Sequence, residues 1–273
     1  MKQTRRIIIA TVLMVVFILQ LLTGNLNLSF FSFPVNVALL VALVGGTYVL
    51  YREKKDSKAV QCFMSSSVSV VLIALSFLGS LVIALAPAAH FQHSWMFNLL
   101  LVLLLANLQL SVMRYRGRYK KRFYLTHIGL FVFVAGLSFG APDTKKSRAI
   151  LSEGQVTEYA YDQTGKICSI GFPLKLEQFE VSYYENKVPR SFKAVISAEN
   201  ESHEILVNHP WSRSWKEDIY LVSHGTDAVT HQPYCVLEFI IQPWKYLVHF
   251  GLILTAVGAF MLLWGKKCNQ NKL

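Results

Sequence analysis

The sequence predicts a membrane protein with about six transmembrane helices and one exported, mostly antiparallel β domain inserted before the last helix. Two observations predict this fold class. Apolar residues make up 53% of the 273 residues, and they gather in long blocks instead of being scattered. A single polar segment of about a hundred residues interrupts these blocks, and its apolar residues alternate with polar ones, as in half-buried strands.

The predicted helices are the apolar runs long enough to cross a hydrocarbon core of about 30 Å. They are residues 7–24, 34–51, 62–86, 95–113, 123–140 and 244–264. The first run resembles a signal peptide, but it is long and no A-x-A cleavage site follows it, so we interpret it as an anchor. The expected domains are a transmembrane bundle at 1–140, an exported β domain at 141–242, and the last helix with a cytoplasmic tail at 243–273.

The net charge of +11 is distributed by side. Lys and Arg number 3 before the first run, 4 in "REKKDSK", 6 in "RYRGRYKKR" and 3 after the last run, whereas the loops "GNLNLSFFSFP" and "APAAHFQHS" have none. The positive-inside rule then predicts that both termini are cytoplasmic. The basic clusters are expected to contact anionic lipid headgroups, and nucleic acid is not an expected partner.

The polar segment 141–242 contains 10 basic and 14 acidic residues and at least five strand-like runs. In "LKLEQFEVSYY" apolar residues alternate with charged ones at a period close to two. Such runs predict a sandwich or a small open barrel. The segment has no phosphate-binding glycine loop, no G-x-S-x-G and no H-E-x-x-H, so nothing in it indicates hydrolytic chemistry.

Cysteines lie at positions 62, 168, 235 and 268 and form no C-x-x-C pair. Cys168 and Cys235 are in the exported segment, where a disulfide can form if their Cα atoms come within bridging distance. Two separate free thiols are the alternative, and the sequence does not decide between them.

His127 is an ionisable residue near the start of an apolar run, in "KKRFYLTHIGLFVFVAGLSFG". It follows Arg122 by five residues, which in a helix places it roughly 7–8 Å beyond the basic cluster. Desolvation favours the neutral imidazole, the form that ligates metals, and an ionisable side chain inside a membrane span is by default a functional candidate. The alternative is an ordinary hydrogen bond to a neighbouring helix. If His127 ligated haem iron, a second axial ligand would have to come from elsewhere.

The other histidines are poorer candidates. His249 is near the start of the last run, and we expect it toward the opposite face of the membrane from His127. His90 and His93 have an H-x-x-H spacing in an exported loop, where a weak metal site or an outer haem site is one interpretation and a solvated loop is another. Structural or surface roles are expected for the remaining four, which are His203, His209, His224 and His231.

Several stretches, taken together and in order, resemble the ResB-like proteins of cytochrome c biogenesis System II. "SWMFNLLLVLLLANLQLSVMRYR" and "FYLTHIGLFVFVAGLSFG" resemble two consecutive membrane helices of that family. "FPLKLEQFEVSYYENKVPRSFKAVIS" and "ILVNHPWSRSWKEDIYLVSHG" resemble its strands, and "QPWKYLVHFGLILTAVGAFMLLWG" resembles its closing helix. The resemblance covers roughly residues 62–266, whereas the first two runs, at 7–51, have no counterpart.

The resemblance implies that the chain binds haem b as transported cargo, conveys it across the bacterial inner membrane and supports its attachment to apocytochrome c on the periplasmic side. It implies that His127 is an axial ligand of the haem iron and that a histidine of a CcsA/ResC-like membrane partner is the other. Because the tryptophan-rich motif of that partner is missing here, we expect an accessory subunit of a cytochrome c synthase (haem lyase) complex and no catalytic residue.

On this interpretation Lys120, Lys121 and Arg122 lie at the depth of the haem propionates. Gly129 and Gly136, with Ala135, give the helix a small face that suits either a flat macrocycle or close helix packing. A competing hypothesis is a structural scaffold that stabilises a partner complex without binding haem. A sensor or transporter subunit is a third hypothesis, but broken helices and a charged midplane site are missing.

Overall fold

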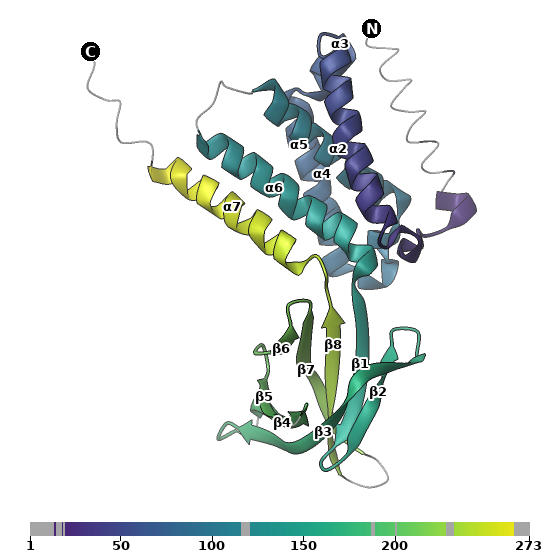
Figure 1. Ribbon diagram of the computed structural model, residues 1–273, viewed down its shortest axis with the longest axis vertical. Helices are drawn as coiled ribbons and strands as arrows, with labels where there is room; N and C mark the ends of the chain where they lie inside the picture. Colours follow the sequence, from purple (N-terminus) through teal and green to yellow (C-terminus); the bar gives the residue numbers. More distant parts are fainter. Residues whose placement is uncertain are drawn as a thin grey trace. The chain divides into compact units, whose positions relative to one another are not determined.

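The computed structural model of the chain describes residues 14, 18, 20–115, 121–186, 189–199, 201–227 and 232–264. The chain divides into two compact units. The helical unit comprises Met1–Pro142 and Trp244–Leu273, and the β unit comprises Asp143–Pro243 (Figure 1). The sequence-based expectation of apolar helices combined with an antiparallel β domain is confirmed.

The helical unit is built from long helices joined by short 3-10 turns. In chain order they are η1 (Leu28–Phe31), α2 (Val35–Lys54), α3 (Lys58–Phe63), α4 (Ser66–Leu85), η2 (Pro87–Ala89), η3 (Phe91–His93), α5 (Trp95–Arg114), α6 (Lys121–Gly140), η4 (Ala141–Asp143) and α7 (Lys245–Trp264). Serine side chains mark two helix starts. Ser57 accepts a hydrogen bond from the Val60 amide at α3, and Ser94 accepts one from the Phe97 amide at α5.

Within the described residues, four helical segments are long and apolar enough to cross a membrane: Val35–Lys54, Ser66–Leu85, Trp95–Arg114 and Lys121–Asp143. Lys245–Met261, in α7, is a shorter apolar helix by the same measure. Most of the predicted run at 7–24 lies outside the described residues. The helices are thus compatible with a membrane protein.

The run at 62–86 was expected as one helix, but the chain breaks at Met64 and Ser65, between α3 and α4. Two α5 side chains bond to carbonyls at the break. Asn107 Nδ2 donates to the Phe63 carbonyl, and Arg114 donates to the Met64 carbonyl. Because these bonds satisfy backbone groups that a continuous helix would have satisfied itself, the break costs little free energy.

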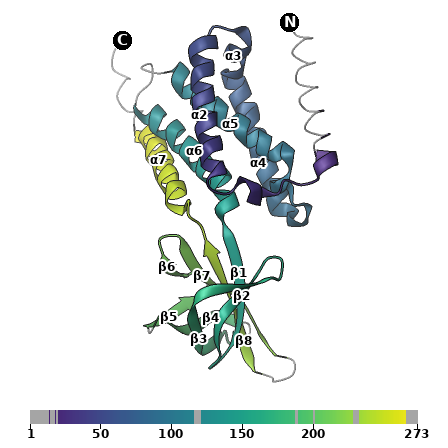
Figure 2. The same cartoon turned by 45° about the vertical axis from the view of Figure 1, so that its right-hand side comes forward.

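The β unit is one eight-stranded sheet with the order β5-β4-β3-β2-β1-β8-β7-β6, and every neighbouring pair is antiparallel. Its strands are β1 (Lys145–Ser152), β2 (Val156–Asp162), β3 (Ile167–Tyr183), β4 (Pro189–Ala198), β5 (Glu201–Leu206), β6 (Trp211–Ser214), β7 (Glu217–Thr226) and β8 (Pro233–Ile241) (Figure 2).

The two ends of this sheet meet. The His203 ring on β5 stacks on the Trp211 ring on β6, with centroids 3.8 Å apart. The His224 ring on β7 packs against Phe192 on β4, with centroids 4.1 Å apart. A single apolar core, which includes Leu151, Leu174 and others, lies on the inner face. Of the two predicted arrangements, a small open barrel describes this sheet better than two stacked sheets.

Candidate functional site

His127 lies in the second turn of α6, half-buried, and its ring orientation is set by its own helix. Its Nδ1 is 2.9 Å from the carbonyl oxygen of Phe123, one turn earlier. A carbonyl can only accept, so Nδ1 carries the proton and donates. In the neutral ring the lone pair is then on Nε2, which has no hydrogen bond to any described residue. Metal-ligating histidines commonly make this bond through their other ring nitrogen.

Phe123, which forms an aromatic cluster with Tyr115 and Tyr124, packs against this imidazole. The Phe123 ring lies 4.0 Å from the His127 ring, centroid to centroid, at an interplanar angle of 31°. Tyr115 meets Phe123 edge-on at 5.8 Å, and the Tyr124 hydroxyl donates to the Tyr115 carbonyl at 2.6 Å. The ring contact and the hydrogen bond that His127 makes with Phe123 restrict its rotamer. The cluster was not predicted, although the i, i+4 spacing of Phe123 and His127 was a signal for part of it.

The basic residues proposed from the sequence begin the same helix. Lys121 is exposed and Arg122 is half-buried in the first turn of α6, and Lys120 lies outside the described residues. The five-residue separation of Arg122 and His127 corresponds to roughly 7–8 Å along the helix axis. The geometry thus combines the Nε2 lone pair of His127 with cationic side chains about a turn and a half earlier along the axis of α6.

The small face of α6 is occupied by α7, which runs antiparallel beside it (Figure 1, Figure 2). A Cβ atom on Gly129 would lie 2.5 Å from the Thr255 amide nitrogen, and one on Gly136 would lie 2.9 Å from the Val248 side chain. Of the two interpretations of these glycines, the structure supports close helix packing, and no flat ligand has room there.

The same pairing places His249 far from His127. Val248 lies beside Gly136, and Thr255 lies beside Gly129, so His249 is about eight residues, or roughly 12 Å, along the axis from His127. The rings of His90 and His93 lie 6.3 Å apart, but no group of three or more His, Cys, Asp or Glu side chains that could hold a metal occurs in the described part of the chain. Within those residues His127 has no partner ligand.

The histidines of the β unit have structural surroundings. His224 packs against Phe179 and Phe192, and His203 stacks on Trp211. His209 is exposed in the turn between β5 and β6, and His231 lies outside the described residues.

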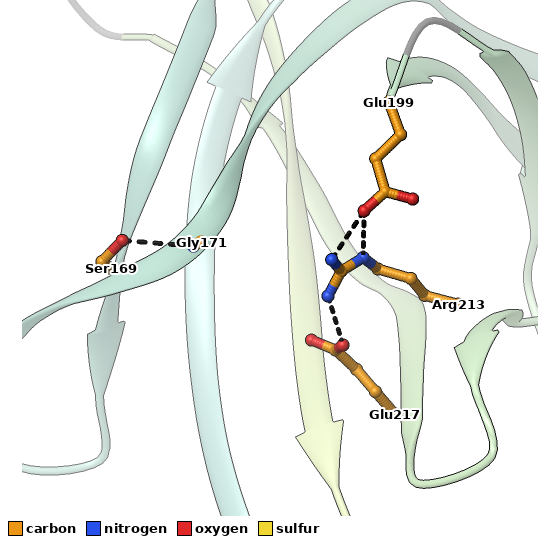
Figure 3. A network of polar contacts seen from close by, with 5 residues as sticks. All are labelled: Ser169, Gly171, Glu199, Arg213 and Glu217. Carbon is orange, nitrogen blue, oxygen red and sulfur yellow. Dashed lines mark hydrogen bonds and ion pairs between the residues drawn. The ribbon is translucent and has the colours of Figure 1, made fainter.

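In the β unit, Arg213 on β6 forms ion pairs with two carboxylates, those of Glu199 and Glu217 (Figure 3). Its guanidinium donates to Glu199 Oε1 at 2.6 and 3.0 Å and to Glu217 Oε2 at 2.7 Å. Burial lowers the pKa of Arg213, but the hydrogen bonds to Glu199 and Glu217 outweigh it, so the pKa lies above its ordinary value. The guanidinium also lies over the Phe172 ring, at 4.1 Å from its centroid. The cluster joins β6 and β7 to the β4–β5 turn.

Cys168 and Cys235 are both free thiols. Cys168 donates to the Ala160 carbonyl, whereas Cys235 is buried in the core of the sheet. Burial raises the pKa of the Cys235 thiol to about 12, so it is protonated and unreactive at neutral pH. Of the two alternatives left open for these cysteines, the structure has the free thiols.

The fold and the site define a class of protein: a unit of apolar helices with a β unit inserted before the last helix, and a half-buried imidazole, His127, in the second turn of α6. Residues 109–238, from α5 through α6 into β8, match the ResB-like family. This match, over slightly less than half of the chain, supports a ResB-like protein, and the family suggests a role in cytochrome c biogenesis, where its members work in a complex. No curated protein matches the chain.

Proposed function

We propose that this chain is the subunit of a cytochrome c maturation complex that ligates haem iron through His127 while the haem, as cargo, crosses the membrane. One observation carries the proposal. The bond from Nδ1 to the Phe123 carbonyl holds His127 in the tautomer whose Nε2 lone pair is free, inside the segment that matches the ResB-like family.

A second axial ligand has to come from another chain on this proposal. Low-spin haem iron takes two axial ligands, and the described residues place no other histidine near His127. A CcsA/ResC-like membrane partner that contributes a histidine completes the coordination. The haem then lies between the two proteins, and neither chain alone holds it tightly.

Lys121 and Arg122, with Lys120, would pair with the haem propionates. The propionate carboxylates need cationic partners at the membrane edge. Lys121 and Arg122 lie in the first turn of the helix that carries His127, and Lys120 directly precedes them in the sequence. The His127 imidazole and this basic cluster could therefore bind haem with its propionate edge toward the membrane surface.

The distribution of basic residues supports an orientation of the chain in the membrane. Clusters flank the helix ends that we assign to the cytoplasm, whereas the loops assigned to the opposite side lack Lys and Arg. Both termini are then cytoplasmic, and the β unit is on the periplasmic side of a bacterial inner membrane. There it docks apocytochrome c or braces the partner, and it performs no chemistry of its own.

The test is the visible absorption spectrum of the full chain, co-purified with a CcsA/ResC-like partner, for the wild type and His127→Gly. We expect a low-spin haem spectrum in the wild type, its loss or conversion in the variant, and its return when imidazole is added, because free imidazole can occupy the vacated position.

The matched control is His249→Gly, which removes an exposed histidine from another apolar helix. It introduces the same helix-destabilising glycine and should leave the spectrum unchanged. A His127→Gly complex that keeps its haem spectrum would move the ligand elsewhere. A complex without haem in every form, including the wild type, would favour the scaffold hypothesis.

A further inference from the structure

A cavity of about 380 Å³ lies between α4, α5 and α6, at the end of the bundle where α4 ends and α5 begins. Its walls are mostly apolar and include the rings of Phe77, Phe97 and Phe133. A smaller cavity of about 250 Å³ shares four of its lining residues, which are Leu28, Asn98, Leu101 and Ser138. This size and lining are typical of sites that bind small apolar molecules.

Ser76 provides an unpaired hydroxyl in the wall of this cavity. The residue is 9% exposed, and its Oγ has no hydrogen-bond partner among the described residues. Serines in apolar helices usually bond to the carbonyl four residues back. Ser69 and Ser80 do so on the same helix, with the Ser65 and Ser76 carbonyls as acceptors. Ser76 is therefore the α4 serine among these three whose hydroxyl is left for another molecule.

Gln92 provides a second unpaired oxygen. It lies in η3 and lines the same cavity, and its Oε1 is buried with no hydrogen-bond partner in the part of the chain that the structure describes. Its backbone carbonyl is already engaged, because it accepts from Asn98 Nδ2 at 3.0 Å. An amide oxygen can only accept, so it requires a hydroxyl or amine donor, whereas the Ser76 hydroxyl can donate or accept.

The described residues that line the cavity include no charged side chain, so the complementary molecule is neutral. Three phenyl rings favour a flat ring over a flexible chain. Haem does not fit, because the lining offers its iron no His, Cys, Met or Tyr and its carboxylates no cation.

We propose that this cavity binds a neutral lipid-soluble quinone or quinol, with its ring among the phenyl groups and its oxygens bonded to Ser76 and Gln92. The Ser76 hydroxyl donates to one ring oxygen, and a quinol hydroxyl donates to Gln92 Oε1. This site is separate from His127, so it does not depend on the haem proposal.

The test is native mass spectrometry of the full chain in detergent, delipidated and then given ubiquinone-2, ubiquinol-2 or dioctanoylglycerol. We expect one quinone or quinol per chain and no retention of the glyceride. Ser76→Ala should weaken binding roughly 2- to 10-fold, the effect of one hydrogen bond, and Gln92→Leu should weaken the quinol more than the quinone.

Two further variants keep the test decisive. Ser67→Ala changes an exposed serine on α4 and should bind as the wild type does. Gly79→Ala places a Cβ 2.8 Å from the ring of Phe97, which lines the cavity, so that ring has to shift and binding should weaken even though Ser76 is intact. Equal retention of the glyceride, absence of quinone binding in the folded wild type, or unchanged binding in both Ser76→Ala and Gly79→Ala would overturn the proposal.

Discussion

In the β unit the Arg213 guanidinium bonds to two carboxylates, whereas in the helical unit Ser76 and Gln92 keep buried oxygens without a partner. Of the four such unpartnered atoms in the described residues, three belong to the helical unit. Because an unpaired buried polar atom costs free energy, its persistence indicates a binding role more than a packing role. The helical unit is therefore where we expect ligands.

The β unit and the helical unit are also stabilised internally by different kinds of contact. The core of the β unit is formed by large side chains such as Leu174, Leu176 and Ile196, which are fully buried. The contact between α6 and α7 is instead made by glycines that let backbones touch. Lipid is as apolar as leucine, so membrane helices gain little from burying side chains and depend on close approach.

Among the variants that test this difference between the two units, the largest loss of stability is expected for Gly129→Ala. The new Cβ would lie 2.5 Å from the Thr255 amide nitrogen and 2.9 Å from the Gly251 carbonyl oxygen, and these backbone atoms can move only if the helices separate. We expect the free energy of unfolding to fall by about 1–3 kcal/mol, as for other overpacked interiors. Thermal unfolding of the full chain in detergent measures it.

The control is Gly45→Ala on α2, where no atom of a described residue lies within 4 Å of the new Cβ. Alanine is the better helix former, so this variant should be neutral or more stable, by up to about 1 kcal/mol. If both alanines had the same effect, close packing of α6 on α7 would not be what holds the pair together.

A smaller effect is expected in the β unit for Glu217→Gln. The Glu217 side chain is 9% exposed, and that of Glu199 is 51% exposed, although both bond to Arg213. Losing the buried partner should cost about 1–2 kcal/mol, because the guanidinium is itself partly exposed and solvent compensates in part.

The matched variant is Glu199→Gln, which should cost less than about 1 kcal/mol. Hydrogen exchange of β6 and β7, read by mass spectrometry on the full chain, reports both variants locally. Equal protection in the two variants would mean that burial does not set the strength of these ion pairs.

The sequence predicted the elements whose pattern is local. Apolar runs indicated helices, alternation in "LKLEQFEVSYY" indicated strands, and the isolated imidazole indicated a candidate site. The sequence did not predict the break between α3 and α4 at Met64 and Ser65, because the apolar run at 62–86 continues across these residues. That break depends on Asn107 and Arg114, which approach from another helix.

The same limit applies to the polar groups. Several serines of α4 look equivalent in the sequence, and only the packing of α5 and α6 around them distinguishes Ser76 from Ser69 and Ser80. The pairing of Arg213 with Glu199 depends on the meeting of the two sheet ends, which no local pattern encodes. The haem ligand role of His127 stays a prediction.

The smallest effect is expected at a half-buried residue of the β unit, Asp162, which ends β2 and begins the turn to β3. Its Oδ1 accepts hydrogen bonds from the Thr164 hydroxyl at 2.6 Å, the Thr164 amide at 2.8 Å and the Lys166 amide at 2.9 Å. The bond from the Thr164 side chain, followed by that from the Lys166 amide, lowers the pKa of Asp162 below its ordinary value of 3.8.

Because the folded pKa is the lower one, the ionised carboxylate stabilises the native turn at every pH above the ordinary value. That stabilisation is lost as the pH falls through the folded pKa. Asp162→Ala should therefore lower the unfolding temperature slightly at pH 7, and the difference from the wild type should shrink below about pH 4. Asp162→Asn keeps one acceptor oxygen and should lose less. If the difference between the wild type and Asp162→Ala instead grew on acidification, the ionised carboxylate would destabilise the folded turn, and its three hydrogen bonds would not be what stabilises the charge.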